Sequence, residues 1–234
     1  MTILYIEAIV QTVEEAIQAE KFGVDRLELV SGMKEGGLTP SYGTIKQVLE
    51  HVNIPVQIMI RPHSYHFAYT KCELDTIYED IRNVVELGGK GIVFGALHQD
   101  NTINMNALET VASISDELDI TVHRAFDEVP SLEEAFLSIA KCRNVQRILT
   151  SGGAPNCIEG KHSLKNLVSL AKSTGGPSIL PGGGLNVNNI DEIHHVVHAD
   201  QYHFGSGVQI DGDFSKGLDA EKVQIVKGIS STKE

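Results

Sequence analysis

Two glutamates of this sequence lie within short apolar runs, where an unpaired carboxylate is costly. Glu7 has apolar neighbours in the run from Ile3 to Ile9, and Glu28 lies between Leu27 and Leu29. A buried carboxylate costs several kcal/mol unless it is paired or protonated. Each glutamate therefore needs a partner, and a carboxyl group held in this way can act as a general acid or base.

Two arginines, Arg61 and Arg124, end other apolar runs and are the partners that we expect for Glu7 and Glu28. Such a set of four charged side chains has two interpretations. It can be a structural layer of ion pairs, or it can surround an anionic or carbonyl substrate. In the second case the carboxylates act as acid or base and the guanidinium groups bind a carbonyl oxygen or an oxyanion.

The segment from His123 to Asp127 offers further polar side chains next to Arg124. Adjacent residues of a strand point to opposite faces. If Arg124 faces the substrate, His123 faces away from it. We therefore predict Arg124 and Asp127, rather than His123, as site residues.

Glycine-rich turns follow three of the later apolar runs and could hold an anion through backbone N–H groups. Glycine also serves ordinary tight turns, which is the alternative role. The predicted anion-binding residues are Ser151, Gly152, Gly183, Gly184, Gly205 and Ser206.

Four residues could ligate a metal ion near the same turns: His63, His66, Cys72 and Cys157. Imidazole and thiolate ligands from separate loops could hold copper(I) if the fold brings them together.

Composition excludes several classes of function. With 31 acidic and 19 basic side chains, the net charge of −12 argues against binding to nucleic acid or an anionic membrane. No apolar stretch approaches the roughly 18 residues of a transmembrane helix. The three cysteines fit neither a disulfide framework nor a structural zinc motif, which favours a reducing, cytoplasmic setting.

The order of the predicted elements indicates how these side chains are positioned. Eight strand-like runs alternate with amphipathic helical stretches, at about 29 residues per unit, which predicts a single eight-stranded parallel βα barrel, a TIM barrel, over residues 1–234 with its core at about 3–229. An open doubly wound sheet is the alternative. Barrel enzymes carry their chemistry at the carboxyl ends of the strands. The predicted strands are Ile3 to Ile9, Arg26 to Val30, Val56 to Ile60, Gly91 to Phe94, Ile120 to His123, Arg147 to Thr150, Ser178 to Leu180 and Gln201 to Phe204.

Six segments, spread in order along most of the chain, resemble the CutC family. They are Glu35 to Ser41, Ile60 to Pro62, Phe94 to Leu97, His123 to Asp127, Leu149 to Gly152 and Pro181 to Gly184. The resemblance implies an eight-stranded βα barrel in the cytoplasm, a role in copper homeostasis and a homo-oligomer such as a dimer.

The sequence departs from the resemblance at positions tied to copper. Some relatives have cysteines, to which copper binding is attributed, where this chain has Ile9 and Val30. Relatives commonly continue with Arg-Gly-Gly-Asp where this chain has the segment from His63 to His66. A copper site would therefore have to be built differently, from His63, His66, Cys72 or Cys157.

Two hypotheses follow. The first, from the resemblance, is a cytoplasmic protein of copper homeostasis that binds copper. The second, from the residues, is a barrel enzyme of the lyase or isomerase type, acting on a small anionic substrate, phosphorylated or not, at the carboxyl ends of the strands. The partner is accordingly a metal ion or a small anion.

Overall fold

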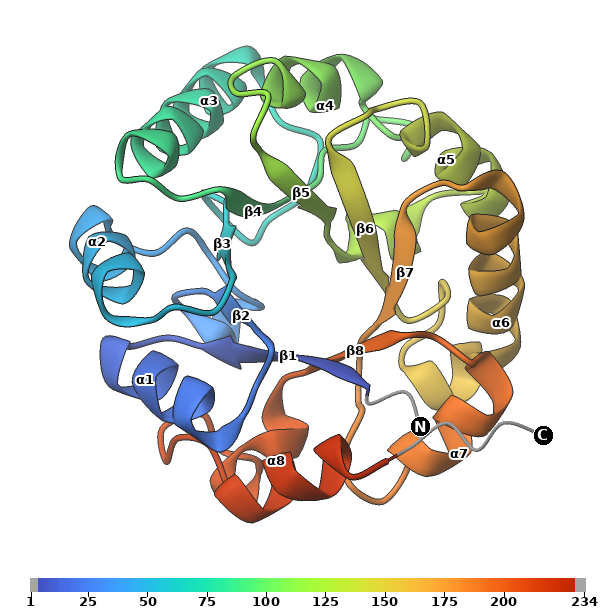
Figure 1. The fold of residues 1–234 in the computed structure, drawn as a ribbon. Coiled ribbons are helices and arrows are strands. Elements are labelled where there is room, and N and C mark those ends of the chain that lie inside the picture. The colour runs from blue at the N-terminus through green and yellow to red at the C-terminus, as the bar shows by residue number, and fades with distance from the viewer. Residues whose placement is uncertain (1–3, 230–234) are drawn as a thin grey trace.

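A computed structural model describes residues 4–229 as a closed ring of eight parallel strands surrounded by helices (Figure 1). The strands pair in the order β7-β6-β5-β4-β3-β2-β1-β8, and a parallel bridge between Gly182 and His203 joins β7 to β8. This closure confirms the barrel and excludes the open sheet. A helix follows each strand and, except after the last, connects it to the next parallel strand, as in other βα barrels.

All eight predicted strands are present, close to their predicted bounds; Ile3 lies outside the described residues. The strands are β1 (Tyr5–Val10), β2 (Arg26–Leu29), β3 (Val56–Met59), β4 (Gly91–Phe94), β5 (Asp119–Val122), β6 (Val145–Thr150), β7 (Ser178–Pro181) and β8 (Gln201–Phe204). The helices are α1 (Val13–Phe22), α2 (Tyr42–His51), α3 (Lys71–Glu86), α4 (Met105–Ala112), α5 (Leu132–Ile139), α6 (Cys157–Thr174), α7 (Ile190–Val197) and α8 (Ala220–Lys227). Among residues 4–229 no helix is both long and apolar enough to cross a membrane.

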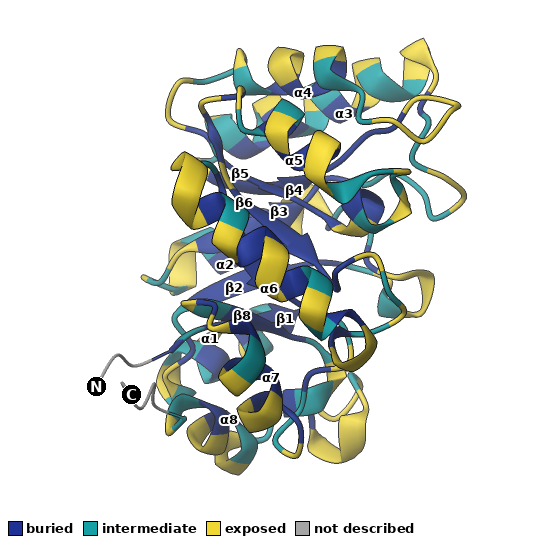
Figure 2. Ribbon diagram, turned by 90° about the vertical axis from the view of Figure 1, so that its right-hand side faces the viewer, coloured by how far each residue is buried: buried dark blue, intermediate teal, exposed yellow. Residues whose placement is uncertain are grey.

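The main hydrophobic core lies between the strands and the helices that cover them. Figure 2 shows the strands as buried and the outward faces of the helices as exposed. Strand residues such as Ile6, Leu27 and Ile148 face this layer and are fully buried. Along each strand these residues alternate with others whose side chains point into the barrel.

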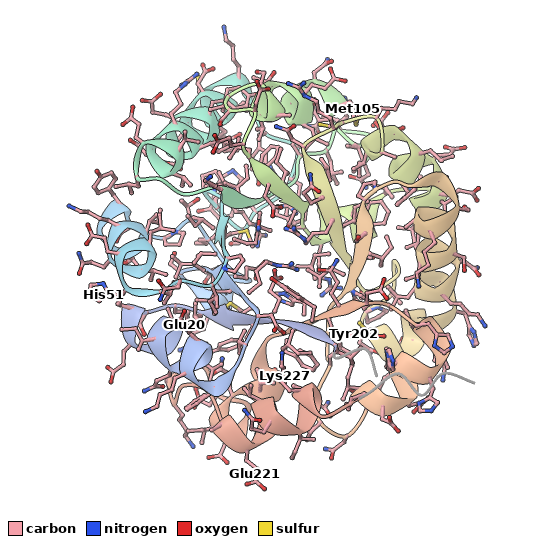
Figure 3. The ribbon with its side chains drawn as sticks, viewed as in Figure 1. Glu20, His51, Met105, Tyr202, Glu221 and Lys227 are labelled. Atoms are coloured by element: carbon pink, nitrogen blue, oxygen red, sulfur yellow. The ribbon has the colours of Figure 1, made fainter. Side chains whose placement is uncertain are left out.

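The interior of the barrel is polar in the part that lies below the carboxyl ends of the strands. Side chains from strands that are not neighbours meet there, as Glu28 of β2 meets His203 of β8. Nitrogen and oxygen atoms lie at the centre of the ring, whereas Glu221 extends outward from α8 (Figure 3). The buried polar side chains of this interior are Glu7, Arg26, Glu28, Gln57, Thr121, Arg147 and His203.

A small apolar cluster lies above these polar side chains, toward the carboxyl ends of the strands. Ile9, Val30, Met59 and Val93 form it, with Met33 and Phe214 packed against it from loops. Ile9 and Val30, the positions tied to copper in some relatives, thus serve as apolar packing in this chain.

The loop after β6 and helix α6 approach each other closely at a glycine. A Cβ atom at Gly160 would lie 1.8 Å from the carbonyl oxygen of Ser151, a distance that no packing adjustment of a side chain can relieve. Gly160 therefore fixes the position of the loop that carries Ser151.

Replacing Gly160 with alanine should destabilise the fold by about 2–3 kcal/mol, because the backbone must move to admit the methyl group. Gly43 of α2 is the matched control, since the nearest atom to a Cβ there is Ser41 Oγ at 4.0 Å. The Gly43→Ala protein should be as stable as the wild type or more stable by up to about 1 kcal/mol. Urea unfolding measures both, and equal stability of the two variants would contradict this account.

Candidate functional site

A cavity of about 290 Å³ opens at the carboxyl ends of the strands. We call it the mouth cavity. Its volume lies near the lower end of the range for small-molecule sites, about 300–1,000 Å³. Apolar residues form part of its wall: Ile9, Met33, Met59, Phe67, Leu185 and Phe214. Its polar lining includes Glu28, Arg61, His123, Arg124, His203 and Ser206.

Glu7 lies below the mouth cavity and is fully committed to partners within the barrel. Register places it beside Arg26 of β2 on one side and His203 of β8 on the other. Its carboxylate accepts a hydrogen bond from Arg26 Nε and contacts His203 Nδ1 at 2.7 Å. The expected pairing of Glu7 with Arg61 or Arg124 is wrong, because those arginines lie beyond the strand ends, above the level of Glu7.

This network keeps Glu7 ionised. Burial by itself would raise the pKa of Glu7, but the charge of Arg26 and the hydrogen bond with His203 outweigh burial and lower it to about 2. The two carboxylates Glu28 and Glu7 in turn raise the pKa of His203 against the effect of its burial. Glu7 is therefore a structural anion and not a proton donor or acceptor at neutral pH.

Glu28 is the carboxyl group that the network leaves available. Its Oε2 lies 3.7 Å from His203 Nε2, while its Oε1 is buried and has no hydrogen-bond partner among the described residues. Burial raises the pKa of Glu28 to about 7; the His203 charge acts against this rise and the Glu7 charge adds to it. Glu28 can thus exchange a proton near neutral pH, as a general acid or base does.

Ligating atoms of Glu7, Glu28 and His203 lie within 4.8 Å of one another. Arg26 and His203 already occupy the carboxylate of Glu7. The group is therefore arranged as two carboxyl groups on either side of an imidazole, and not as an open metal site.

Arg61 combines a structural contact with a free donor. Its Nη atoms donate to the carbonyl oxygens of residues 35–37 and of Ser64, so it holds two loops together. Its guanidinium lies 4.9 Å from the centre of the Phe67 ring. Its Nε is buried without a partner in the described chain. The predicted ion pair of Arg61 with a strand glutamate is absent from residues 4–229.

His123 lines the mouth cavity, contrary to the expectation that it faces away. Strand β5 ends at Val122, so alternation no longer applies at His123, which starts a short 3₁₀ turn. Its Nδ1 accepts the backbone N–H of Ala125, which places the proton of the neutral ring on Nε2. Burial and the nearby Arg61 charge lower the pKa of His123 to about 3, so it is a neutral donor.

Arg124 and Asp127 hold the loop after β6. Arg124 donates to Asp127 Oδ2 and to Ser151 Oγ, both at 2.8 Å. Asp127 accepts the backbone N–H groups of Ser151 and Gly153 and the Thr150 hydroxyl. The carboxylate of Asp127 therefore occupies the loop's hydrogen-bond donors, in the place where an external anion was expected.

Fewer of the predicted anion-binding residues are therefore available than the sequence suggested. The N–H of Ser151 is bound by Asp127, and the N–H of Gly152 donates to Thr150 Oγ1 at 2.8 Å. Neither is free for an anion, so the expectation for Ser151 and Gly152 is wrong. The remaining predicted residues Gly183, Gly184, Gly205 and Ser206 do line the mouth cavity.

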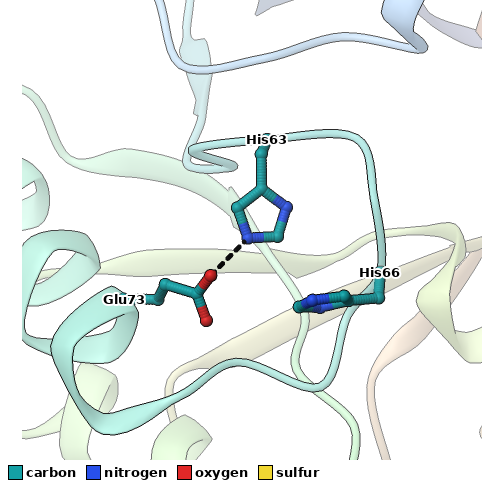
Figure 4. A group of neighbouring side chains, drawn as sticks. All are labelled: His63, His66 and Glu73. Atoms are coloured by element: carbon teal, nitrogen blue, oxygen red, sulfur yellow. Dashed lines mark hydrogen bonds and ion pairs between the residues drawn. The ribbon is translucent and has the colours of Figure 1, made fainter.

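A second cluster lies in the loop after β3 and at the start of α3. Ligating atoms of His63, His66 and Glu73 lie within 4.8 Å of one another, and we call these residues the His63 cluster (Figure 4). His63 Nε2 lies 3.0 Å from Glu73 Oε1, whereas His63 Nδ1 is buried and has no partner in the part of the chain described. Thr70 and Glu73 cap α3 reciprocally, which fixes the carboxylate toward the loop.

The cysteines do not join this cluster. Cys72 is exposed near the start of α3 and is not among the clustered ligands. Cys157 is the first residue of α6, which Asn156 caps. The Cys157 thiol is buried, and burial raises its pKa to about 12, so it stays protonated and is a poor ligand. The expectation of a joint His–Cys site is wrong for the described residues.

Fold and site together define a closed βα barrel with a small-molecule cavity at its mouth and an imidazole–carboxylate cluster beside it. Comparison with known proteins identifies the family. The CutC family matches residues 4–208. The human copper homeostasis protein cutC homolog is 38% identical over 198 residues, which is 85% of this chain and 71% of that protein. The CutC family protein of Treponema denticola is 37% identical over 201 residues, 86% of this chain and 80% of that protein. The chain belongs to the CutC family.

Solved structures agree with this assignment. The CutC structure from Streptococcus agalactiae superposes with a TM-score of 0.79 at 31% identity, covering 86% of this chain and 98% of that chain. Phosphoribosylanthranilate isomerase from Thermotoga maritima has a TM-score of 0.61 at 13% identity, which reflects the shared barrel alone.

The raised pKa of Glu28 predicts a specific pH dependence of stability. Its folded value is about 7 and its ordinary value is 4.5. Between these values the folded protein holds a proton that the unfolded chain releases, so stability falls as the pH rises. Glu28→Gln lacks this effect. The free energy of unfolding of the wild type should therefore drop by about 3 kcal/mol relative to Glu28→Gln between pH 4.5 and pH 7.5.

Urea unfolding of both proteins across this range is the measurement. Glu221→Gln, which changes an exposed side chain on α8, is the control and should keep a constant difference from the wild type. Parallel curves for the wild type and Glu28→Gln would show that Glu28 titrates normally.

Proposed function

We propose that this CutC-family protein serves copper homeostasis in the cytoplasm by binding a copper ion at the His63 cluster. The observation that carries the proposal is the close approach of His63 Nε2 and Glu73 Oε1, at 3.0 Å, with His66 beside them. Two ligands that are each about 2 Å from one ion lie about this far apart. A metal ion can therefore take the place of the hydrogen bond between the two side chains.

The donor atoms favour copper among the biological cations. Two imidazoles and one carboxylate supply nitrogen and oxygen ligands, which suit copper(II) better than copper(I) in the absence of a thiolate. The rings of His63 and His66 are 4.8 Å apart and nearly perpendicular, so they present their nitrogens from two directions. The names of the human and Streptococcus agalactiae relatives support the same metal.

Histidine variants test the proposal. The wild type should bind one copper(II) per chain in equilibrium dialysis, and His63→Asn or His66→Asn should weaken binding at least tenfold, because each removes a ligand. Cys72→Ser and Cys157→Ser should bind like the wild type. His51→Asn, an exposed histidine on α2, is the matched control.

Unchanged affinity in the His63→Asn, His66→Asn double variant, or its loss in Cys72→Ser, would contradict the assignment of the ligands.

A further inference from the structure

Three residues that line the mouth cavity each carry one buried polar atom without a hydrogen-bond partner among residues 4–229. These atoms are Glu28 Oε1, Arg61 Nε and His123 Nε2. Buried polar groups in folded proteins are nearly always hydrogen-bonded, so each exception calls for a cause. A single ligand in the cavity accounts for all three.

The two nitrogens are donors on side chains that contact the same aromatic ring, that of Phe67. The Arg61 guanidinium lies 4.9 Å from the centre of Phe67, and the rings of Phe67 and His123 are 4.9 Å apart. Arg61 Nε–H carries positive charge, and His123 Nε2–H is the neutral tautomer because Nδ1 accepts from Ala125. A charged and a neutral donor side by side suit the two oxygens of a carboxylate.

The apolar residues of the lining favour an organic ligand over an inorganic anion. Ile9, Met33, Met59 and Phe214 contribute a continuous apolar wall next to the donors. Inorganic phosphate would leave this wall in contact with water, whereas an organic group would cover it. The cavity of about 290 Å³ limits the ligand to a small molecule.

Glu28 gives the ligand a second polar contact. Its free oxygen lies deeper in the barrel than the donors, because Glu28 precedes the end of β2. The charged or titratable groups that face it are His203 from β8, Glu7 from β1 and Arg26 from its own strand. Glu7 and Arg26 neutralise one another, so an added anion acts mainly on Glu28 and His203.

We propose that the mouth cavity binds a small organic hydroxycarboxylate, whose carboxylate accepts hydrogen bonds from Arg61 and His123 and whose hydroxyl contacts Glu28, and that Glu28 takes up a proton when this anion enters. The site is separate from the His63 cluster and does not depend on copper binding. Proton uptake follows because a second negative charge in the buried cavity favours the neutral form of Glu28.

Calorimetric titration with matched probes tests the ligand class. The probes are 4-hydroxybenzoate and 3-hydroxybutyrate, their primary amides, and inorganic phosphate. At pH 7.5 at least one acid should bind with an affinity at least tenfold above that of its amide, and phosphate should not displace it. Equal affinities of acid and amide for both pairs, or displacement by phosphate, would overturn the proposal.

Two variants test the assigned roles. His123→Asn keeps an oxygen that can accept the Ala125 N–H but removes the Nε2 donor, so it should weaken binding of the acid about tenfold. His195→Asn, an exposed histidine on α7, is the control and should bind like the wild type. Unchanged affinity in His123→Asn would remove this residue from the site.

In Glu28→Gln, binding of the acid should no longer be accompanied by proton uptake, whatever the change in affinity. Repeating the titrations at pH 7.5 in buffers of different ionisation enthalpy gives the number of protons taken up. The wild type should take up a fraction of a proton per ligand and Glu28→Gln none. Persistence of the same uptake in Glu28→Gln would show that another group titrates and would contradict the role of Glu28.

Discussion

The ion pair of Glu7 with Arg26, completed by His203, is the interaction on which the interior of this barrel depends. These side chains come from β1, β2 and β8, so the pair spans the region where the first and last strands of the ring meet. His203 also forms the backbone bridge that joins β8 to β7. Removing Arg26 would leave the fully buried carboxylate of Glu7 with His203 as its remaining partner, which is far costlier than losing a surface pair.

Because Glu7 is paired within the barrel, other polar groups are left to contact a ligand at the mouth cavity. Arg61 donates hydrogen bonds to loop carbonyl oxygens, and Arg124 donates to Asp127. In the described part of the chain, the residues that line the mouth cavity keep three buried polar atoms without a partner: one oxygen of Glu28, one nitrogen of Arg61 and one nitrogen of His123. The structure thus separates charges that hold the barrel together from those that face a ligand, and it places the two kinds at successive levels of the same interior.

The sequence predicts the architecture well, because the alternation of apolar runs and capped helices follows from local patterns. It also places Glu28, Arg61 and Arg124 correctly near the strand ends. The partners of Glu7 depend on how β1 pairs with β2 and β8, and the pattern within a single strand does not reveal which side chains that pairing places beside it. His203 carries the same signal as Glu7, a polar residue inside an apolar strand, and could have been found by it. Arg26 begins its strand, and there sequence alone does not separate a buried arginine from an exposed one.

Other differences come from the exact ends of elements. His123 faces the cavity because β5 stops one residue before it, and Cys157 lies in a helix rather than a loop because Asn156 caps α6 at that point. Glu73, which is not among the ligands predicted from the sequence, enters the His63 cluster through the capping box at the start of α3. Such boundaries are set by a few hydrogen bonds and are the least certain part of any prediction from sequence.

Glu7 is fixed as a structural anion, whereas Glu28 remains free to exchange a proton. The most direct measurement is a titration of the side-chain carboxyl carbons of Glu7 and Glu28 by ¹³C NMR, with each signal assigned from its glutamine variant. We expect the Glu7 signal to stay constant from pH 4 to pH 8, in keeping with a pKa of about 2, and the Glu28 signal to move with a midpoint of about 7. A Glu28 midpoint at its ordinary value of 4.5, or a Glu7 signal that moves within this range, would contradict this expectation.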